Sequence, residues 1–205
     1  MTAARAGHWD RAYQDGDATR SWFQAEPTQS LRMIEATGAR VEDSIIDIGG
    51  GSSRLAEELL HRGYSDITVL DVSATALQLA RDRLGAASGG VAWICEDLLA
   101  WRPERSYAIW HDRAVFHFMV DAAERLEYLH TLNSATNPGS VAVLGCFALD
   151  GPEHCSGLPV VRYNADGIGH QLGRDWVLIA EHREEHFTPS GGVQPFTWAM
   201  LRRER

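Results

Sequence analysis

The fold is decided by the stretch Ser44-Ile45-Ile46-Asp47-Ile48-Gly49-Gly50-Gly51-Ser52-Ser53. Its apolar half is rich in β-branched residues and meets three glycines before a helix could form, which predicts a buried strand. The glycines allow positive φ angles and let a ligand approach the bare backbone. Helical spacing follows at once, so the stretch predicts the strand, tight turn and helix start of a nucleotide-binding cradle.

Composition limits the classes of protein that remain. The chain has 205 residues, 44% of them hydrophobic, enough for one substantial core and a single domain. Its net charge of −9 and lack of basic runs, apart from the terminal Arg202-Arg203-Glu204-Arg205, argue against nucleic acid and membrane partners. The chain has three cysteines without framework spacing, no signal-like start and no long apolar segment, which predicts a cytoplasmic protein. We expect it to be a monomer or a homodimer.

Strand and helix patterns alternate after the opening stretch. Strands are predicted at residues 45–48, 66–71, 91–95, 106–110 and 141–147. Helices are predicted from Leu55 to Gly63, from Ser73 to Gly85, and from Asp121, with Glu124 completing a capping box, to Asn137-Pro138-Gly139. This alternation predicts a parallel sheet over a core of residues 44–147.

The two ends of the chain differ from this core. Residues 1–43 are predicted to form a helical lid, with a helix from about Pro27 to Glu35. Residues 148–205 begin with a loop rich in Gly and Pro at 150–159, followed by a helix at about 165–172. Strands at 176–182 and 197–201, joined only by a loop, predict an antiparallel pair at the sheet edge.

The residues around the glycine turn discriminate between nucleotide ligands. Arg54 stands where a dinucleotide-binding turn needs its third glycine, which disfavours a dehydrogenase, and no Gly-Lys-Ser/Thr follows for a triphosphate. Asp47 precedes Gly49 by two residues, where a carboxylate would repel pyrophosphate and attract an ammonium group. The turn is therefore predicted to bind a cofactor with an amino-acid moiety.

These motifs resemble class I S-adenosylmethionine-dependent methyltransferases over about residues 41–147. The matching residues are Asp47-Ile48-Gly49-Gly50-Gly51, Asp71 after the second strand and Glu96-Asp97-Leu98 after the third. The resemblance implies a Rossmann-like, doubly wound, mostly parallel seven-stranded sheet with an antiparallel last strand. It also implies S-adenosyl-L-methionine as cofactor and S-adenosyl-L-homocysteine as product.

The resemblance also assigns roles within the crevice that the acids at adjacent strand ends would line. The glycine turn approaches the methionyl part, the second acid binds the ribose hydroxyls and the third meets the adenine amino group. A Trp-Asp-x-x-Tyr pattern is similar to one in some lysine and small thiol or chalcogen methyltransferases. The residues expected to contact the cofactor are Trp9, Tyr13, Asp47, Gly49, Gly51, Asp71, Val72, Asp97, Leu98 and His111.

The polar segment from His111 to His117 follows the fourth strand and supplies the catalytic candidates. Methyl transfer requires alignment of a nucleophile, removal of its water and, where needed, removal of its proton. We expect Asp112 to lie at the sulfonium end, Arg113 to hold an anionic substrate and His117 to act as base or donor. Two alternatives stay open, a structural ion pair for Arg113 and a buried core position for His117.

Trp22, His154 and Cys155 are the candidates for the substrate pocket. Trp22, like Trp9 and Tyr13, either covers the sheet edge or closes over the ligand. No pair of Cys or His residues has the spacing of a metal site, so no metal is predicted. Cys95 and Cys146 lie within apolar strands and are expected to be inert core residues.

The predicted function is methyl transfer to a small-molecule acceptor, with a thiol or sulfide favoured because a thiolate needs little beyond a basic, dehydrated pocket. A protein-lysine methyltransferase is the first alternative. The second is a non-catalytic S-adenosylmethionine-binding subunit.

Overall fold

The computed structural model describes residues 2–14 and 16–205. Its strands are β1 (Ile45–Ile48), β2 (Ile67–Asp71), β3 (Val91–Cys95), β4 (Tyr107–Arg113), β5 (Thr136–Phe147), β6 (His154–Cys155), β7 (Leu158–Pro159), β8 (Trp176–Phe187) and β9 (Val193–Arg203). Its α-helices are α1 (Thr2–Tyr13), α2 (Thr28–Ala36), α3 (Leu55–His61), α4 (Ala74–Leu84), α5 (Ala122–Ser134) and α6 (Ala165–Leu172). Short 3-10 helices lie at Gly85–Gly90 and Phe116–Phe118.

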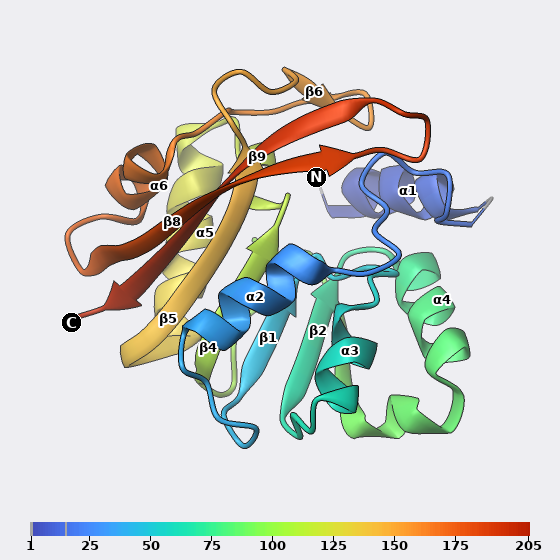
Figure 1. Ribbon diagram of the computed structural model, residues 1–205, viewed down its shortest axis with the longest axis horizontal. Helices are drawn as coiled ribbons and strands as arrows, with labels where there is room; N and C mark the ends of the chain where they lie inside the picture. Colours follow the sequence, from blue (N-terminus) through green and yellow to red (C-terminus); the bar gives the residue numbers. More distant parts are fainter. Residues whose placement is uncertain (1, 15) are drawn as a thin grey trace.

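Seven strands form one sheet in the order β3-β2-β1-β4-β5-β9-β8 (Figure 1). Strands β1 to β5 pair in parallel, and β9 is antiparallel to both β5 and β8. The predicted Rossmann-like sheet with an antiparallel last strand is therefore confirmed. Parallel order also brings the carboxyl ends of β1 to β4 to one edge, where α1 lies beside α4 in Figure 1.

Helices cover both faces of the sheet. Because successive side chains of a strand point to opposite sides, β1 packs against helices on each face. Ile46 and Ile48 pack with residues of α5 and α6 in one apolar cluster, and Ile45 packs with residues of α2 and α3 in the other. All of these isoleucines are at most 1% exposed. The continuous apolar run of β1 is what a strand buried on both faces requires.

The boundaries around β4 and α5 differ from prediction. Strand β4 continues to Arg113 instead of ending at residue 110, so the polar segment begins inside the sheet. Helix α5 ends at Ser134, and Asn137-Pro138-Gly139 belongs to β5. The predicted capping box is wrong, because Asp121 makes no side-chain cap and Glu124 binds Arg5 instead.

The C-terminal segment is also more regular than predicted. The loop at 150–159 contains the small hairpin β6–β7, and strands β8 and β9 extend well beyond 176–182 and 197–201. Pairing between β8 and β9 continues to Phe187 and Val193. The β8 residues added beyond 182 are Arg183, Glu184, Glu185, His186 and Phe187, four polar residues before one apolar residue, so no apolar alternation marks them as strand.

Within the described ranges, no helix combines the length and apolar character needed to cross a membrane.

Candidate active site

A cavity of about 650 Å³ opens at the carboxyl ends of β1 to β4, beneath α1 and beside the β6–β7 hairpin. Its size lies within the range of small-molecule sites. Every residue predicted to contact the cofactor lines this cavity except Gly51. Arg113, Trp22 and Cys155 line it as well, whereas Asp112, His117 and His154 do not.

The acid after β2 is held by the start of α4. Asp71 is 8% exposed and accepts a 2.7 Å hydrogen bond from the backbone N–H of Ser73. Ser73 caps α4 and also donates from its hydroxyl to Asp10 of α1 at 2.7 Å. Burial, reinforced by the nearby charge of Asp47, raises the pKa of Asp71 to about 7. The carboxyl group is thus positioned, dehydrated and close to titration at neutral pH.

The glycine turn leaves room only for backbone. A Cβ at Gly50 would lie 2.5 Å from Asp47 Oδ2, and one at Gly51 would lie 2.9 Å from the Tyr13 hydroxyl. Gly49 has a φ of +62°, and its Cβ would lie 2.1 Å from Val115 Cγ2. These close approaches explain why the strand must end in three glycines.

We expect Gly49→Ala to destabilise the protein by about 3 kcal/mol, since a left-handed alanine costs roughly 1–2 kcal/mol and overpacking adds about as much. The melting temperature should fall by roughly 6–12 °C. Gly63→Ala is the control, because Gly63 has a φ of +86° while the nearest contact of its Cβ would be an ordinary 3.8 Å. Equal losses in the two variants, measured by thermal unfolding, would remove the packing argument.

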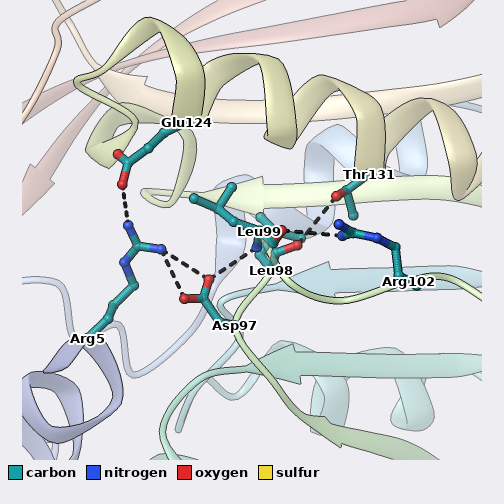
Figure 2. Close-up of polar contacts among 7 residues, drawn as sticks. All are labelled: Arg5, Asp97, Leu98, Leu99, Arg102, Glu124 and Thr131. Atoms are coloured by element: carbon teal, nitrogen blue, oxygen red, sulfur yellow. Dashed lines mark hydrogen bonds and ion pairs between the residues drawn. The ribbon is translucent and has the colours of Figure 1, made fainter. Parts of the chain in front are cut away.

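The acid after β3 is bound by the N-terminal helix (Figure 2). Arg5 of α1 donates to both carboxylate oxygens of Asp97 at 3.1 Å and to Glu124 of α5 at 2.6 Å. The backbone N–H of Leu99 also donates to Asp97 Oδ1. A carboxylate offers about four acceptor positions, so these three bonds leave roughly one for a ligand. Arg5 fastens α1 across this end of the cavity.

A carboxylate–imidazole pair lies between the first and fourth strands. Parallel register sets Asp47 beside His111, and His111 Nδ1 lies 2.7 Å from Asp47 Oδ1. Both residues are at most 3% exposed. His111 Nε2, shielded from solvent, has no hydrogen-bond partner among the described residues. A neutral imidazole held through Nδ1–H by a carboxylate has a free acceptor at Nε2.

Asp112 is fully buried and organises the turn after β4. Its carboxylate accepts from the backbone N–H groups of Val115 and Phe116 and from the Tyr128 hydroxyl at 2.6 Å. This places Asp112 on the α5 side of the sheet, away from the cavity, because successive strand residues alternate in direction. Burial raises its pKa to about 6.

His117 is also fully buried and lies outside the cavity lining. Its Nδ1 accepts a long bond of 3.4 Å from the backbone N–H of Phe147, and its ring packs against those of Phe118 and Phe147. Burial and the charge of Arg113 lower the pKa of His117 to about 3, so the ring is neutral. Like Nε2 of His111, Nε2 of His117 has no hydrogen-bond partner among the described residues. Of these two histidines, His111 lines the cavity and His117 does not.

Aromatic side chains form the cover between α1 and the following loop. The Trp9 ring lies 5.7 Å from that of Trp22 and 5.3 Å from that of Phe118, and Trp22 Nε1 donates to the Tyr13 hydroxyl at 3.0 Å. Cys155 is buried, and its burial raises the thiol pKa to about 11, while His154 is exposed. Residues 1 and 15 of the predicted lid lie outside the described residues.

Several site residues escaped sequence reasoning. Arg5 and Glu124 meet across 119 positions, and Glu184 of β8 accepts from Trp198 Nε1 and Gln24 near the cavity. No local pattern marks such contacts. The Asp47–His111 pair was within reach, since parallel pairing of adjacent strands already aligned the two ends. Across the described residues, no group of three or more His, Cys, Asp or Glu side chains is arranged to hold a metal ion.

Comparison with known proteins identifies this arrangement. Residues 45–139 match the family model of a methyltransferase domain, which covers β1 to the start of β5 and every acid described above except Asp10 of α1 and Glu184 of β8. Over this segment, a little under half of the chain, the protein is similar to S-adenosylmethionine-dependent methyltransferases.

Solved structures reproduce the fold of this methyltransferase at low identity. A methyltransferase from Anabaena variabilis aligns with a TM-score of 0.76 at 15% identity, covering 99% of this chain and 95% of that one. A structure reported under the conversion of a disulfide bond into a thioacetal group during echinomycin biosynthesis aligns with a TM-score of 0.76 at 18% identity. The alignment covers 97% of this chain and 92% of that one.

Curated relatives are similar over shorter segments. EEF1A lysine methyltransferase 2 of Danio rerio is 33% identical over 86 residues, 38% of this methyltransferase and 37% of that protein. Malonyl-[acyl-carrier protein] O-methyltransferase 1 of Ilyobacter polytropus is 27% identical over 96 residues, 46% and 35% of the two chains. The matched segments thus span about a third of these relatives, whose acceptors differ in kind.

Proposed function

We propose that this methyltransferase transfers the methyl group of S-adenosyl-L-methionine to a small-molecule nucleophile. The observation that carries the proposal is the cavity lined by a bare glycine turn and by buried acids from three neighbouring strands, Asp47, Asp71 and Asp97. Such a wall accepts hydroxyl and amine donors and a positive charge, and offers no cradle for phosphate. When bound, the cofactor would supply a methyl group activated by sulfonium.

The residues fit distinct parts of that cofactor. The carboxylate of Asp71 would accept from the ribose hydroxyls, and the free acceptor position on Asp97 would take the adenine amino group, between Val72 and Leu98. Tyr13, Trp9 and the backbone of Gly49 would enclose the methionyl part, whereas Gly51 lies outside the cavity lining. Helix α1, fastened by Arg5, would exclude water from the site.

The geometry supports His111 as the group that removes a proton from the acceptor. His111 lines the cavity, its Nε2 has no hydrogen-bond partner among the described residues, and Asp47 holds its ring through Nδ1. Asp112 and His117, which sequence reasoning nominated, do not line the cavity, so the proposal gives neither a direct role. Asp112 would instead shape the turn that carries Val115 and Arg113.

A protein-lysine acceptor is the second candidate, favoured by the similarity to the EEF1A lysine methyltransferases. The charge of Arg113 on the cavity wall counts against it, because an arriving lysine ammonium would be repelled. A small acceptor, with a thiol or sulfide included, and a cytoplasmic site of action remain our proposal. A non-catalytic subunit would bind the cofactor without forming product.

The test has two stages. Titration calorimetry with S-adenosyl-L-methionine should give saturable binding at one site per chain. Release of S-adenosyl-L-homocysteine is then measured with thiols, sulfide, amines, phenols and carboxylic acids, and a cell lysate is labelled with a radioactive methyl donor. Turnover of a panel compound supports the proposal, whereas a discrete labelled protein band without small-molecule turnover supports the lysine candidate. Binding with neither outcome supports the non-catalytic subunit.

A further inference from the structure

Arg113 is a cation without an ion-pair partner among the described residues. No Asp or Glu oxygen of the described residues lies within the 4.0 Å ion-pair limit of its guanidinium. Only Nη1 is used, donating to the backbone carbonyl of Trp22 at 3.1 Å, and the guanidinium lies 4.7 Å above the Phe196 ring. Burial lowers the pKa of Arg113, a measure of how unfavourable the charged form is there.

The free donors have a particular geometry. Nε and Nη2 are shielded from solvent and have no acceptor among the described residues. These two nitrogens form one edge of the guanidinium, and their N–H bonds run parallel in the fork that binds both oxygens of a carboxylate. A buried arginine with this edge unused, lining a cavity, is a ready site for a carboxylate.

The nearby protein acids form no ion pair with that edge. Glu184 contributes a favourable charge, but its oxygens accept from Gln24 Nε2 at 3.0 Å and Trp198 Nε1 at 2.7 Å. Asp47 is bound to His111 at 2.7 Å. The other acidic groups that act on Arg113 are Cys155 and Tyr13, and burial raises the pKa of both. Neither is an anion at neutral pH. The histidines coupled to it, His117 and His186, have lowered pKa values and supply no negative charge.

We propose that Arg113 binds a carboxylate of the methyl acceptor, so that the substrate is a small carboxylic acid with a separate nucleophilic atom. This inference rests on the proposed function. The guanidinium of Arg113 lies over the ring of Phe196 in β9, on the side of β4 that faces β5 and β9, whereas Asp71 and Asp97 lie on the opposite side at β2 and β3. His111 and Arg113, two residues apart on β4, would face the nucleophile and the carboxylate of one molecule.

The test uses matched acids and amides. Probes are 3-mercaptopropionate with 3-mercaptopropionamide, β-alanine with β-alaninamide, and 4-hydroxybenzoate with 4-hydroxybenzamide. Binding to the S-adenosyl-L-homocysteine-loaded protein is measured by ligand-observed NMR, together with product release. At least one acid should bind the wild-type protein tenfold or more tightly than its amide. Arg113→Met should abolish this preference, and Arg113→Lys, which keeps the charge without the fork, should keep only part of it.

Cofactor affinity separates the two proposals. Arg113→Met and Arg113→Lys should bind S-adenosyl-L-methionine within threefold of wild type, as should Arg183→Gln, a control at an exposed ion pair with Asp150. A tenfold loss in Arg113→Met alone would mean that the arginine holds the donor's carboxylate, and would overturn the inference. Wild-type binding of cofactor without any preference for acids also overturns it, while absence of cofactor binding refutes the proposed function itself.

Discussion

Asp71→Asn should weaken binding of S-adenosyl-L-methionine about 100-fold, because hydrogen bonds to a charged acceptor contribute roughly 1.5–3 kcal/mol each and the amide keeps one neutral acceptor. The Ser73 N–H can still bond to the amide oxygen, so α4 should keep its start. Titration calorimetry measures the loss. Asp66→Asn is the control, since Asp66 is paired with Arg105 just before β2, at the opposite end of that strand.

The same carboxyl group should make binding depend on pH. Its pKa of about 7 in the free protein will fall when hydroxyl donors bind the ionised form. Binding must therefore release a proton below pH 7. As pH falls below 7, the dissociation constant should rise by up to tenfold per pH unit, and above pH 7 it should stay constant. Asp71→Asn should remove this dependence. A flat wild-type profile between pH 5.5 and 8.5 would contradict the role assigned to Asp71.

In the absence of ligand, the stability of the fold depends on pH in the opposite direction to cofactor binding. Asp71 and Asp112 have folded-state pKa values above their ordinary values, so each favours the folded protein at low pH, and that contribution is lost as pH rises through about 7 and about 6. His117, with its pKa lowered to about 3, acts in the other direction below pH 6.5. Weaker cofactor binding in acid therefore need not reflect loss of the fold.

The parts that sequence could predict are those encoded by neighbouring residues. The strand at Ile45–Ile48 follows from its apolar run, the cap at Ser73 from its short polar side chain, and the helix at Ala165–Leu172 from the flanking Asn164 and Gly173. The start of β5 at Thr136 does not, because Asn137-Pro138-Gly139 has the composition of a turn. Its strand character depends on pairing with β4, where the register shifts between Tyr107 and Ile109.

For the site, sequence indicated the strand ends but not the partners of their side chains. Asp97 was expected to face adenine alone, yet Arg5 reaches it from 92 positions away. His117 looked like a base because it follows a strand in a polar segment, but its direction depends on the 3-10 turn at Phe116–Phe118, which buries it between two phenylalanine rings. Side-chain direction within a short irregular turn is not encoded by spacing.

His111→Gln should slow methyl transfer by roughly 10²–10⁴-fold for an acceptor that must lose its proton, the usual contribution of a positioned general base. Cofactor affinity should stay within threefold, because the glycine turn and Asp71 are untouched. Turnover is measured as release of S-adenosyl-L-homocysteine under saturating cofactor. His182→Gln is the matched control, since His182 is exposed on β8.

The size of that loss should depend on the acceptor, which separates a base from a merely structural histidine. An acceptor that is already ionised at the assay pH needs no proton acceptor, so His111→Gln should affect it little, whereas a less acidic analogue should show the full loss. A structural role would slow both equally. Because His111 Nδ1 is bound to Asp47, the proton of the acceptor would have to go to Nε2, which has no hydrogen-bond partner among the described residues. A uniform loss across acceptors would return the imidazole to the role of packing against Trp198.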